Sequence, residues 1–199
     1  MHTQTHMLLS AAVFGRGSDG FQPRLGLAAA AGGLLPDVAS FVLVGWAAAR
    51  GRGAAEIFGA DYFSPAWQAV MAPFHSVPLW AALLAAGWRS RPIRAFAASG
   101  LLHQAFDFPL HHDDPHRHFW PLGDWRFASP LSYWDPAHGG VWVAPIELLL
   151  GLGLVIWLWR RWTGRPARAF LALCGLLYLG QAAAAVPFTV LGPPDPTVG

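Results

Sequence analysis

The chain has 199 residues, of which 54% are hydrophobic and only 12% are charged, and its mean hydropathy is +0.37. This composition is typical of membrane proteins rather than of soluble domains. All 13 basic residues are arginine, and they lie in short groups between apolar runs, which argues against nucleic-acid binding. Cys174 is the only cysteine, so this chain can form neither an intrachain disulfide nor a thiolate zinc cluster.

The apolar runs are rich in Ala, Leu and Gly and lack strand-like alternation, which predicts helices. In chain order they are Thr5–Phe14, Leu25–Ala49, Pro65–Trp88, Ala95–Phe106, Gly139–Trp159 and Ala169–Pro194. Four of them reach the length of about 17–25 residues that a transmembrane helix needs. We therefore predict an all-α, polytopic helical membrane bundle of about five transmembrane helices plus a short or re-entrant N-terminal helix. Residues 1–192 are expected to form one domain, followed by a flexible tail at 193–199.

The arginines predict an orientation in the membrane. Seven of the 13 fall in residues 89–94 and 160–168, which the positive-inside rule places in the cytoplasm. The polar stretch 107–138 should then face the other side. Arg50 and Arg52 agree with this orientation only if residues 51–64 return across part of the membrane, so the path of that segment stays open. The first 14 residues lack a basic n-region, so no cleavable signal peptide is expected.

Most apolar runs carry one ionisable residue, and such residues are costly inside a membrane. Their distances along the chain to an arginine group are nearly constant: 13 residues from Asp37 to Arg50, 14 from His75 to Arg89, 13 from Arg94 to Asp107 and 13 from Glu147 to Arg160. Thirteen helical residues span roughly 20 Å, about two-thirds of a ~30 Å hydrocarbon core. A shared depth is expected if these side chains converge on one site.

His103 and Asp107 are four residues apart, so both side chains project from one helix face and could hold one ion. Adding Asp37 and His75 gives a mixed imidazole and carboxylate set that suits zinc, manganese or iron. The absence of thiolates favours an open, hydrolytic site over a structural one. Simpler alternatives exist: Asp37 could open a helix, His75 could bond to a carbonyl freed by a proline, and Glu147 could be a helix–helix contact.

The stretch after Asp107 is rich in ionisable residues: His111, His112, Asp113, Asp114, His116 and His118. It is either a solvated polar loop or the lid of the site. The aromatic residues of 119–127 are typical of anchoring at the lipid headgroup level. Arg117 and Arg126 are suited to bind an anionic headgroup or phosphate, although a surface ion pair or snorkelling would explain them equally.

Five motifs follow one another in the chain: His6-Met-Leu-Leu-Ser, GGLLPD at 32–37, FHS at 74–76, LLHQAFD at 101–107 and FWPLGDWRF at 119–127. Together, over about residues 4–130, they resemble the LexA-regulated, membrane-bound metal-dependent hydrolase family of bacterial inner-membrane proteins. The resemblance implies a multi-pass helical fold with five metal ligands: His6, Asp37, His75, His103 and Asp107. Ala39 and the segment 70–74 depart from the family pattern, where a second Asp and a further histidine are often found. The number of metal ions is therefore left open.

The order His, Asp, His and then H-x-x-x-D is also loosely similar to zinc-dependent phospholipase C. That similarity implies a second ion held by His111 or His112, His138 and Glu147, and the other loop histidines, His116 and His118, are further candidates. His138 and Glu147 are nine residues apart rather than one helical turn, which weakens this comparison.

The expected function is a membrane-embedded hydrolase that cleaves a lipid or a lipid-linked ester or phosphoester. Zinc is the favoured cofactor, as one or two ions, with manganese or iron as alternatives. Asp37 or Asp107 is the expected base for a metal-activated water. The expected partners are the bilayer and a lipid substrate, with the site nearer the non-cytoplasmic face. The main alternative is a metal transporter or metal-delivery protein, and a purely structural protein is the third hypothesis.

Overall fold

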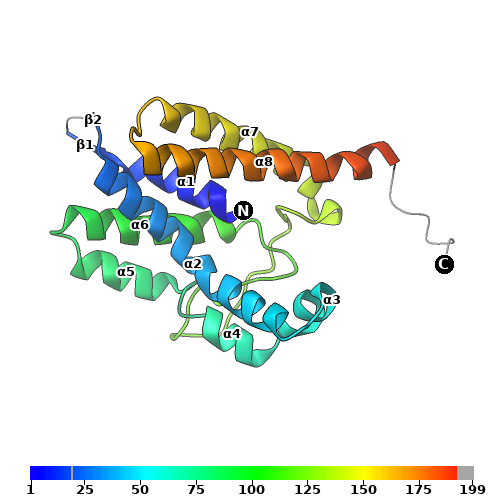
Figure 1. Ribbon diagram of the computed structural model, residues 1–199. Helices are drawn as coiled ribbons and strands as arrows, with labels where there is room; N and C mark the ends of the chain where they lie inside the picture. Colours follow the sequence, from blue (N-terminus) through cyan, green and yellow to red (C-terminus); the bar gives the residue numbers. More distant parts are fainter. Residues whose placement is uncertain (19, 192–199) are drawn as a thin grey trace.

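The computed structural model describes residues 1–18 and 20–191, and within this part the chain is almost entirely helical (Figure 1). The elements are α1 (Thr3–Phe14), β1 (Arg16–Gly17), β2 (Gly20–Phe21), α2 (Pro23–Ala49), α3 (Ala54–Glu56), a π-helical turn (Ile57–Asp61), α4 (Pro65–Met71), α5 (Val77–Ala86), α6 (Arg91–Asp107), a 3-10 turn (Pro136–His138), α7 (Gly140–Trp159) and α8 (Arg165–Leu191). The all-α prediction is confirmed. The predicted tail at 193–199 lies outside the described residues.

Three of the described helices are long and apolar enough to cross a membrane: α2, α7 and the part of α8 from Arg165 to Ala183. With 27 residues, α2 is about 40 Å long and exceeds a ~30 Å hydrocarbon core. The structure therefore supports a membrane protein with three candidate spans. The predicted number of about five spans is not confirmed.

The prediction of one continuous helix over residues 65–88 is wrong. Two short helices, α4 and α5, are separated by a turn at residues 72–76. Pro73 has no N–H to continue the helical hydrogen bonds, and the Ser76 hydroxyl accepts a hydrogen bond from the Leu79 N–H, which begins α5. With ten residues, α5 is about 15 Å long, half the thickness of the hydrocarbon core.

Two predicted boundaries also change. The short run predicted at residues 95–106 is part of a longer helix, because α6 begins at Arg91 and includes 17 residues. The open segment 51–64 contains only α3 and the π-helical turn, which lie beside the end of α2 (Figure 1). The half-length N-terminal helix is confirmed as α1, with 12 residues.

Closely packed glycines hold the first half of the bundle together. A Cβ at Gly32 in α2 would lie 2.0 Å from the Phe96 carbonyl oxygen of α6, and one at Gly33 would lie 2.7 Å from the His6 carbonyl oxygen of α1. A Cβ at Gly100 in α6 would lie 2.2 Å from the Trp80 ring of α5. Small residues let helix backbones approach closely. Here they place α2 against both α1 and α6, which also contact each other.

The second half of the bundle, α7 and α8, packs against the other side of α1 (Figure 1). The core of this contact contains Leu8 of α1, Leu158 of α7, and Leu171 and Tyr178 of α8, all nearly inaccessible to solvent. The short helix α1 thus packs between two groups of helices and contacts both. Both of its faces are buried, although it is too short to cross a membrane alone.

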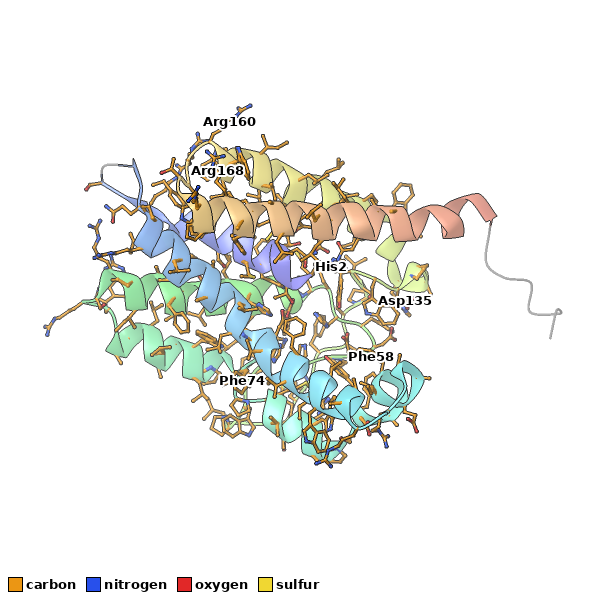
Figure 2. The ribbon with its side chains drawn as sticks, viewed as in Figure 1. His2, Phe58, Phe74, Asp135, Arg160 and Arg168 are labelled. Atoms are coloured by element: carbon orange, nitrogen blue, oxygen red, sulfur yellow. The ribbon has the colours of Figure 1, made fainter. Side chains whose placement is uncertain are left out.

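Three arginine-bearing connections lie at one end of the molecule (Figure 1): the β1–β2 hairpin, the α5–α6 turn and the α7–α8 turn. Arg160 and Arg168 mark this end in Figure 2, and Asp135 of the long loop 108–139 lies far from them. Arginine side chains at this end stack on tryptophan rings, for example Arg168 on Trp159 at 4.2 Å. Such pairs are typical of a membrane interface. The end of α2, which carries Arg50, lies at the opposite end of the bundle.

Candidate metal centre

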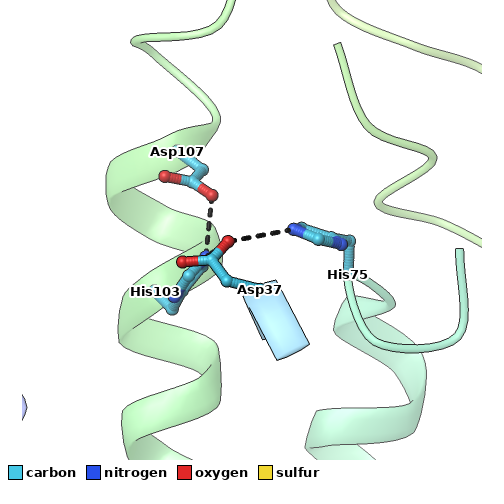
Figure 3. Close-up of side chains that lie close together, drawn as sticks. All are labelled: Asp37, His75, His103 and Asp107. Atoms are coloured by element: carbon cyan, nitrogen blue, oxygen red, sulfur yellow. Dashed lines mark ion pairs between the residues drawn. The ribbon is translucent and has the colours of Figure 1, made fainter. Parts of the chain in front are cut away.

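Four predicted side chains meet between α2, the α4–α5 turn and α6 (Figure 3). Asp37 comes from α2, His75 from the turn, and His103 and Asp107 from successive turns of α6. One ligand atom from each residue lies within 4.8 Å of the others. The two histidines and Asp107 are almost completely buried, and the Asp37 side chain is 19% exposed. The structure therefore brings together residues that lie up to 70 positions apart in the chain.

Both imidazole rings of this group turn Nε2 toward the carboxylates and Nδ1 toward a backbone carbonyl. His103 Nδ1 lies 2.9 Å from the Gly33 carbonyl oxygen, and His75 Nδ1 lies 3.3 Å from the Met71 carbonyl oxygen. A carbonyl oxygen can only accept, so each Nδ1 must carry a proton, and a neutral ring then presents the lone pair of Nε2. Both Nε2 atoms are buried without a hydrogen-bond partner, and they face Asp37 and Asp107.

The lone pairs and carboxylates of this group are all acceptors. The Met1 amino group donates to Asp107 Oδ1 at 3.0 Å, but the Nε2 atoms of His75 and His103 have no donor, so a further cation or proton would stabilise them. Holding Nδ1 on a carbonyl is also how proteins orient metal-binding histidines. Pro36 has no N–H to donate to the Gly32 carbonyl four residues earlier, so one helical hydrogen bond of α2 is missing there. The Gly33 carbonyl that contacts His103 belongs to the same turn of α2. The donor set and its orientation fit a divalent metal.

Asp107 is the centre of the polar network. One carboxylate oxygen accepts a hydrogen bond from His6 Nε2 at 2.8 Å, and the other lies 2.8 Å from His103 Nε2. The His6 and His103 rings are stacked, with centroids 3.7 Å apart. The resemblance implies His6 as a fifth ligand. The structure places its Nε2 against this carboxylate, and none of the groups of potential metal ligands among the described residues includes His6. Asp107 is therefore contacted from α1 and from its own helix.

A second group shares Asp107 and adds two loop histidines, His111 and His116. His111 Nδ1 donates to Asp114 at 2.8 Å, so its buried Nε2 faces Asp107 at 3.4 Å. The His116 ring stacks on His75 at 3.7 Å, which joins the two groups. The shared carboxylate offers one oxygen to each group, an arrangement that suits one ion or a pair.

The electrostatics of the two loop histidines differ. Burial lowers the pKa of His111, but the Asp107 and Asp114 carboxylates outweigh it and raise the pKa to about 9. Burial, followed by the neighbouring His75 and His111, holds the pKa of His116 well below its ordinary value. The carboxylates thus stabilise positive charge at His111, in the position where a cation would bind.

The remaining candidates for a second ion lie apart from this centre. His112 and His138 stack at 3.4 Å near Asp113 and form a third, more exposed group of potential ligands. His118 is buried, with Nδ1 at 3.1 Å from the Gln104 side-chain oxygen, and belongs to none of the three groups found among the described residues.

Glu147 is buried at the interface of α1 and α7 rather than with the histidines of the loop. It accepts hydrogen bonds from the Thr5 hydroxyl and the His2 N–H, both at 2.6 Å. The Thr5 hydroxyl also lies 2.5 Å from the Tyr178 hydroxyl. These contacts match the simpler alternative of a helix–helix contact, and no group of potential metal ligands in the described part of the chain includes Glu147.

The two arginines of the loop are held by local contacts. Arg117 forms an ion pair with Asp124 at 2.8 Å, and Arg126 donates to the Pro115 carbonyl oxygen at 3.4 Å. Asp124 is 79% exposed, so this pair contributes little to stability and can exchange for another anion. Headgroup binding by these arginines remains a prediction.

An apolar cavity of about 690 Å³ leads to the centre. Asp37, His111 and His116 line one part of it, so it touches both groups that share Asp107. Asp107 and His103 are not among its lining residues, whereas Asp37 is, and the Asp37 carboxylate accepts a hydrogen bond from Thr3 at 2.5 Å. Of the two carboxylates of the four-residue group, Asp37 is therefore the one that a molecule in the cavity would meet.

Some contributors were missed by the sequence analysis. These are the Gly33 carbonyl that orients His103 and the Thr3 hydroxyl on Asp37. Asp114, which the sequence analysis named only as part of the polar loop, holds His111. The GG pair directly before LLPD is the one available signal, because it predicts close helix packing there. The hydroxyl and the loop carboxylate have no pattern that marks them.

Comparisons with known protein families, with curated proteins and with solved structures found no significant match. The resemblance to the LexA-regulated hydrolase family therefore stays a prediction based on the five motifs.

Proposed function

We propose that this protein is a membrane-embedded, metal-dependent hydrolase that cleaves a lipid or a lipid-linked ester or phosphoester. The observation that carries the proposal is the orientation of three histidines: His75, His103 and His111. Each has Nδ1 held by an oxygen acceptor, and each presents a buried, unpartnered Nε2 to carboxylates. Such pre-oriented acceptors are what a metal site requires, and a purely structural polar cluster has no need of them.

The residues that would hold the metal are Asp37, His75, His103 and Asp107, with His111 and His116 as ligands of a second ion that shares Asp107. Imidazole nitrogens and carboxylate oxygens without thiolates favour zinc, with manganese or iron as alternatives. When bound, a divalent cation lowers the pKa of a coordinated water toward about 7 and polarises the scissile group.

The protein's own residues would do the rest of the work. Asp37 lies at the boundary between the metal group and the cavity, so its carboxylate can take a proton from an attacking water. The Thr3 hydroxyl keeps that carboxylate turned toward the histidines. Asp107 is enclosed by His6, His103 and His111, which makes it a ligand rather than the base.

Membrane depth supports a lipid substrate. The centre is built on α2, which is long enough to cross a membrane, and lies about 13 residues from Arg24 at the arginine-rich end. If that end is cytoplasmic, as the positive-inside rule predicts for a bacterial inner membrane, the centre lies nearer the other face. The loop that covers it carries exposed aromatic side chains such as Phe119 and Trp125, which suit the headgroup region.

The test compares the wild type with Asp107→Asn and, as a matched control, Glu56→Gln, an exposed carboxylate on α3. Each is purified in detergent, its zinc, manganese and iron are quantified, and its hydrolysis of a mixed bacterial lipid extract is followed by mass spectrometry. We expect metal and lipid cleavage in the wild type and the control, and loss of both in Asp107→Asn. Full cleavage by Asp107→Asn, or zinc flux into proteoliposomes without cleavage, would overturn the proposal.

A further inference from the structure

The cavity beside the centre lies between two helices that are both candidate membrane spans, α2 and α8. Its lining residues come from the N-terminal residues and α1, from α2, from the segment after α3, from the long loop and from α8. The volume of about 690 Å³ lies within the usual range for small-molecule sites.

The two parts of the cavity differ in chemistry. Toward the centre it is lined by Asp37, His111 and His116, which are ionisable. Away from the centre it is lined by large apolar side chains of α2 and α8, and Phe41 and Leu173 there are 54% and 56% exposed. Because these helices are candidate spans, that exposed apolar rim faces lipid hydrocarbon rather than water. The cavity is therefore open sideways to the bilayer.

This shape restricts the occupant. A polar soluble molecule would leave the apolar walls without suitable contacts, and a transmembrane helix, about 10 Å wide, would fit only ~9 Å of its length into this volume. An amphiphile with a polar head and a flexible apolar chain matches both parts at once. Its chain would lie between α2 and α8, and its head would reach the carboxylate and histidines.

We infer that the α2–α8 cavity is a binding site for the acyl chain of a membrane lipid, which enters sideways from the bilayer and brings its head to the metal centre. The fate of the bound lipid rests on the proposed hydrolase function, whereas its binding does not. A second hollow of about 430 Å³ shares Phe58, Tyr62, Asp114 and Tyr133 with the first and extends under the loop.

Leu177 and Leu176 provide a matched pair of positions on α8. Leu177 lines the cavity, whereas its neighbour Leu176 is 65% exposed and does not. Leu177→Trp would fill the chain site, and Leu176→Trp adds the same bulk on another face of the helix. A second filling variant, Val44→Trp on α2, covers the case in which Leu177→Trp does not fold.

The probe is a diacyl glycerophospholipid with a photoreactive diazirine in one acyl chain, used with the full chain in nanodiscs. We expect crosslinks to concentrate on the cavity residues of α2 and α8, also after removal of metal with a chelator. Leu177→Trp or Val44→Trp should lower this labelling about fivefold or more. A fivefold loss corresponds to the smallest free-energy cost that is usual for overpacking a filled site. Leu176→Trp should leave the labelling unchanged.

Labelling spread evenly over all lipid-facing helices, or unaffected by both filling variants, would overturn the inference and leave the hydrolase proposal intact. Cavity labelling in a protein that neither binds metal nor cleaves lipid would support the inference and contradict the hydrolase. The two proposals can therefore fail separately.

Discussion

The Gly33→Ala substitution tests how the helix packing positions the metal ligands. Gly33 packs against α1, and its carbonyl oxygen orients His103 through Nδ1. An added Cβ would lie 2.7 Å from the His6 carbonyl oxygen and 2.8 Å from the Ser10 hydroxyl oxygen. Both distances are shorter than a carbon–oxygen contact allows, and the first neighbour is backbone, so α1 and α2 must move apart.

The expected magnitude has two parts. Replacing a glycine in a helix interior by alanine normally stabilises the protein by about 1 kcal/mol, whereas overpacking destabilises it by about 1–3 kcal/mol. Gly33→Ala should therefore be neutral to destabilising by about 2 kcal/mol, a fall in Tm of up to roughly 4–8 °C for a chain of this length. Because the His103 ring loses its support, metal affinity should fall about 10–100-fold.

The assay pairs this variant with Gly45→Ala on the same helix. A Cβ at Gly45 meets nothing within 4 Å, so that change should keep full metal affinity and leave Tm equal or higher. Both variants are measured in detergent, with zinc affinity from competition with a chromophoric chelator and Tm from intrinsic fluorescence. Equal zinc affinity for Gly33→Ala and Gly45→Ala would refute the reasoning that helix packing at Gly33 sets the ligand geometry.

Three further predictions follow from other contacts. Thr5→Val removes the hydroxyl that donates to the buried Glu147 carboxylate and contacts the Tyr178 hydroxyl. The free energy of unfolding should fall by about 1–3 kcal/mol, seen as a lower Tm, while the metal content stays unchanged. A simultaneous loss of metal would show that Glu147 belongs to the centre. Ser76→Ala removes the cap of α5 beside His75 and should cost about 1 kcal/mol, with faster amide hydrogen exchange at the start of α5; unchanged exchange there would contradict this role. Zinc affinity should decrease as the pH falls from about 9, since protons compete for imidazole and the Asp107 and Asp114 carboxylates, which outweigh burial, raise the pKa of His111 to about 9. Equilibrium dialysis that shows no pH dependence would argue against histidine ligation.

The sequence predicted helices well where hydrophobic length alone decides. The runs at residues 25–49 and 139–159 became α2 and α7 almost unchanged. It failed at 65–88, because the overall hydropathy of that run hides a local event. Pro73 and the Ser76 cap break the helix, and the break is what frees His75 to face the centre.

Counting residues along the chain predicted the depth of the site in the membrane, but not the side of the bundle on which each residue lies. Asp37, His75, His103 and Asp107 share a depth and do converge. Glu147 was assigned the same depth but lies at another interface, since depth along a helix axis does not define which side of the bundle a side chain faces.

The arginine from which the depth of Asp37 should be counted also changes, from Arg50 to Arg24. Arg50 lies at the end of α2 opposite the arginine-rich connections, whereas Arg24, also 13 residues away, belongs with them (Figure 1). In the loop, no periodicity separates the inward His111 and His116 from His112, because irregular backbone carries no facing rule.

The most direct test of the central claim is X-ray absorption spectroscopy at the zinc edge on protein purified in detergent and loaded with one equivalent of zinc, compared with Asp37→Asn and His103→Gln. The wild type should show nitrogen and oxygen neighbours at about 2.0–2.1 Å with imidazole outer-shell scattering and no sulfur, and both variants should lose ligands or zinc. A protein that holds no zinc, or whose zinc environment is the same in all three, would contradict the assignment of this centre.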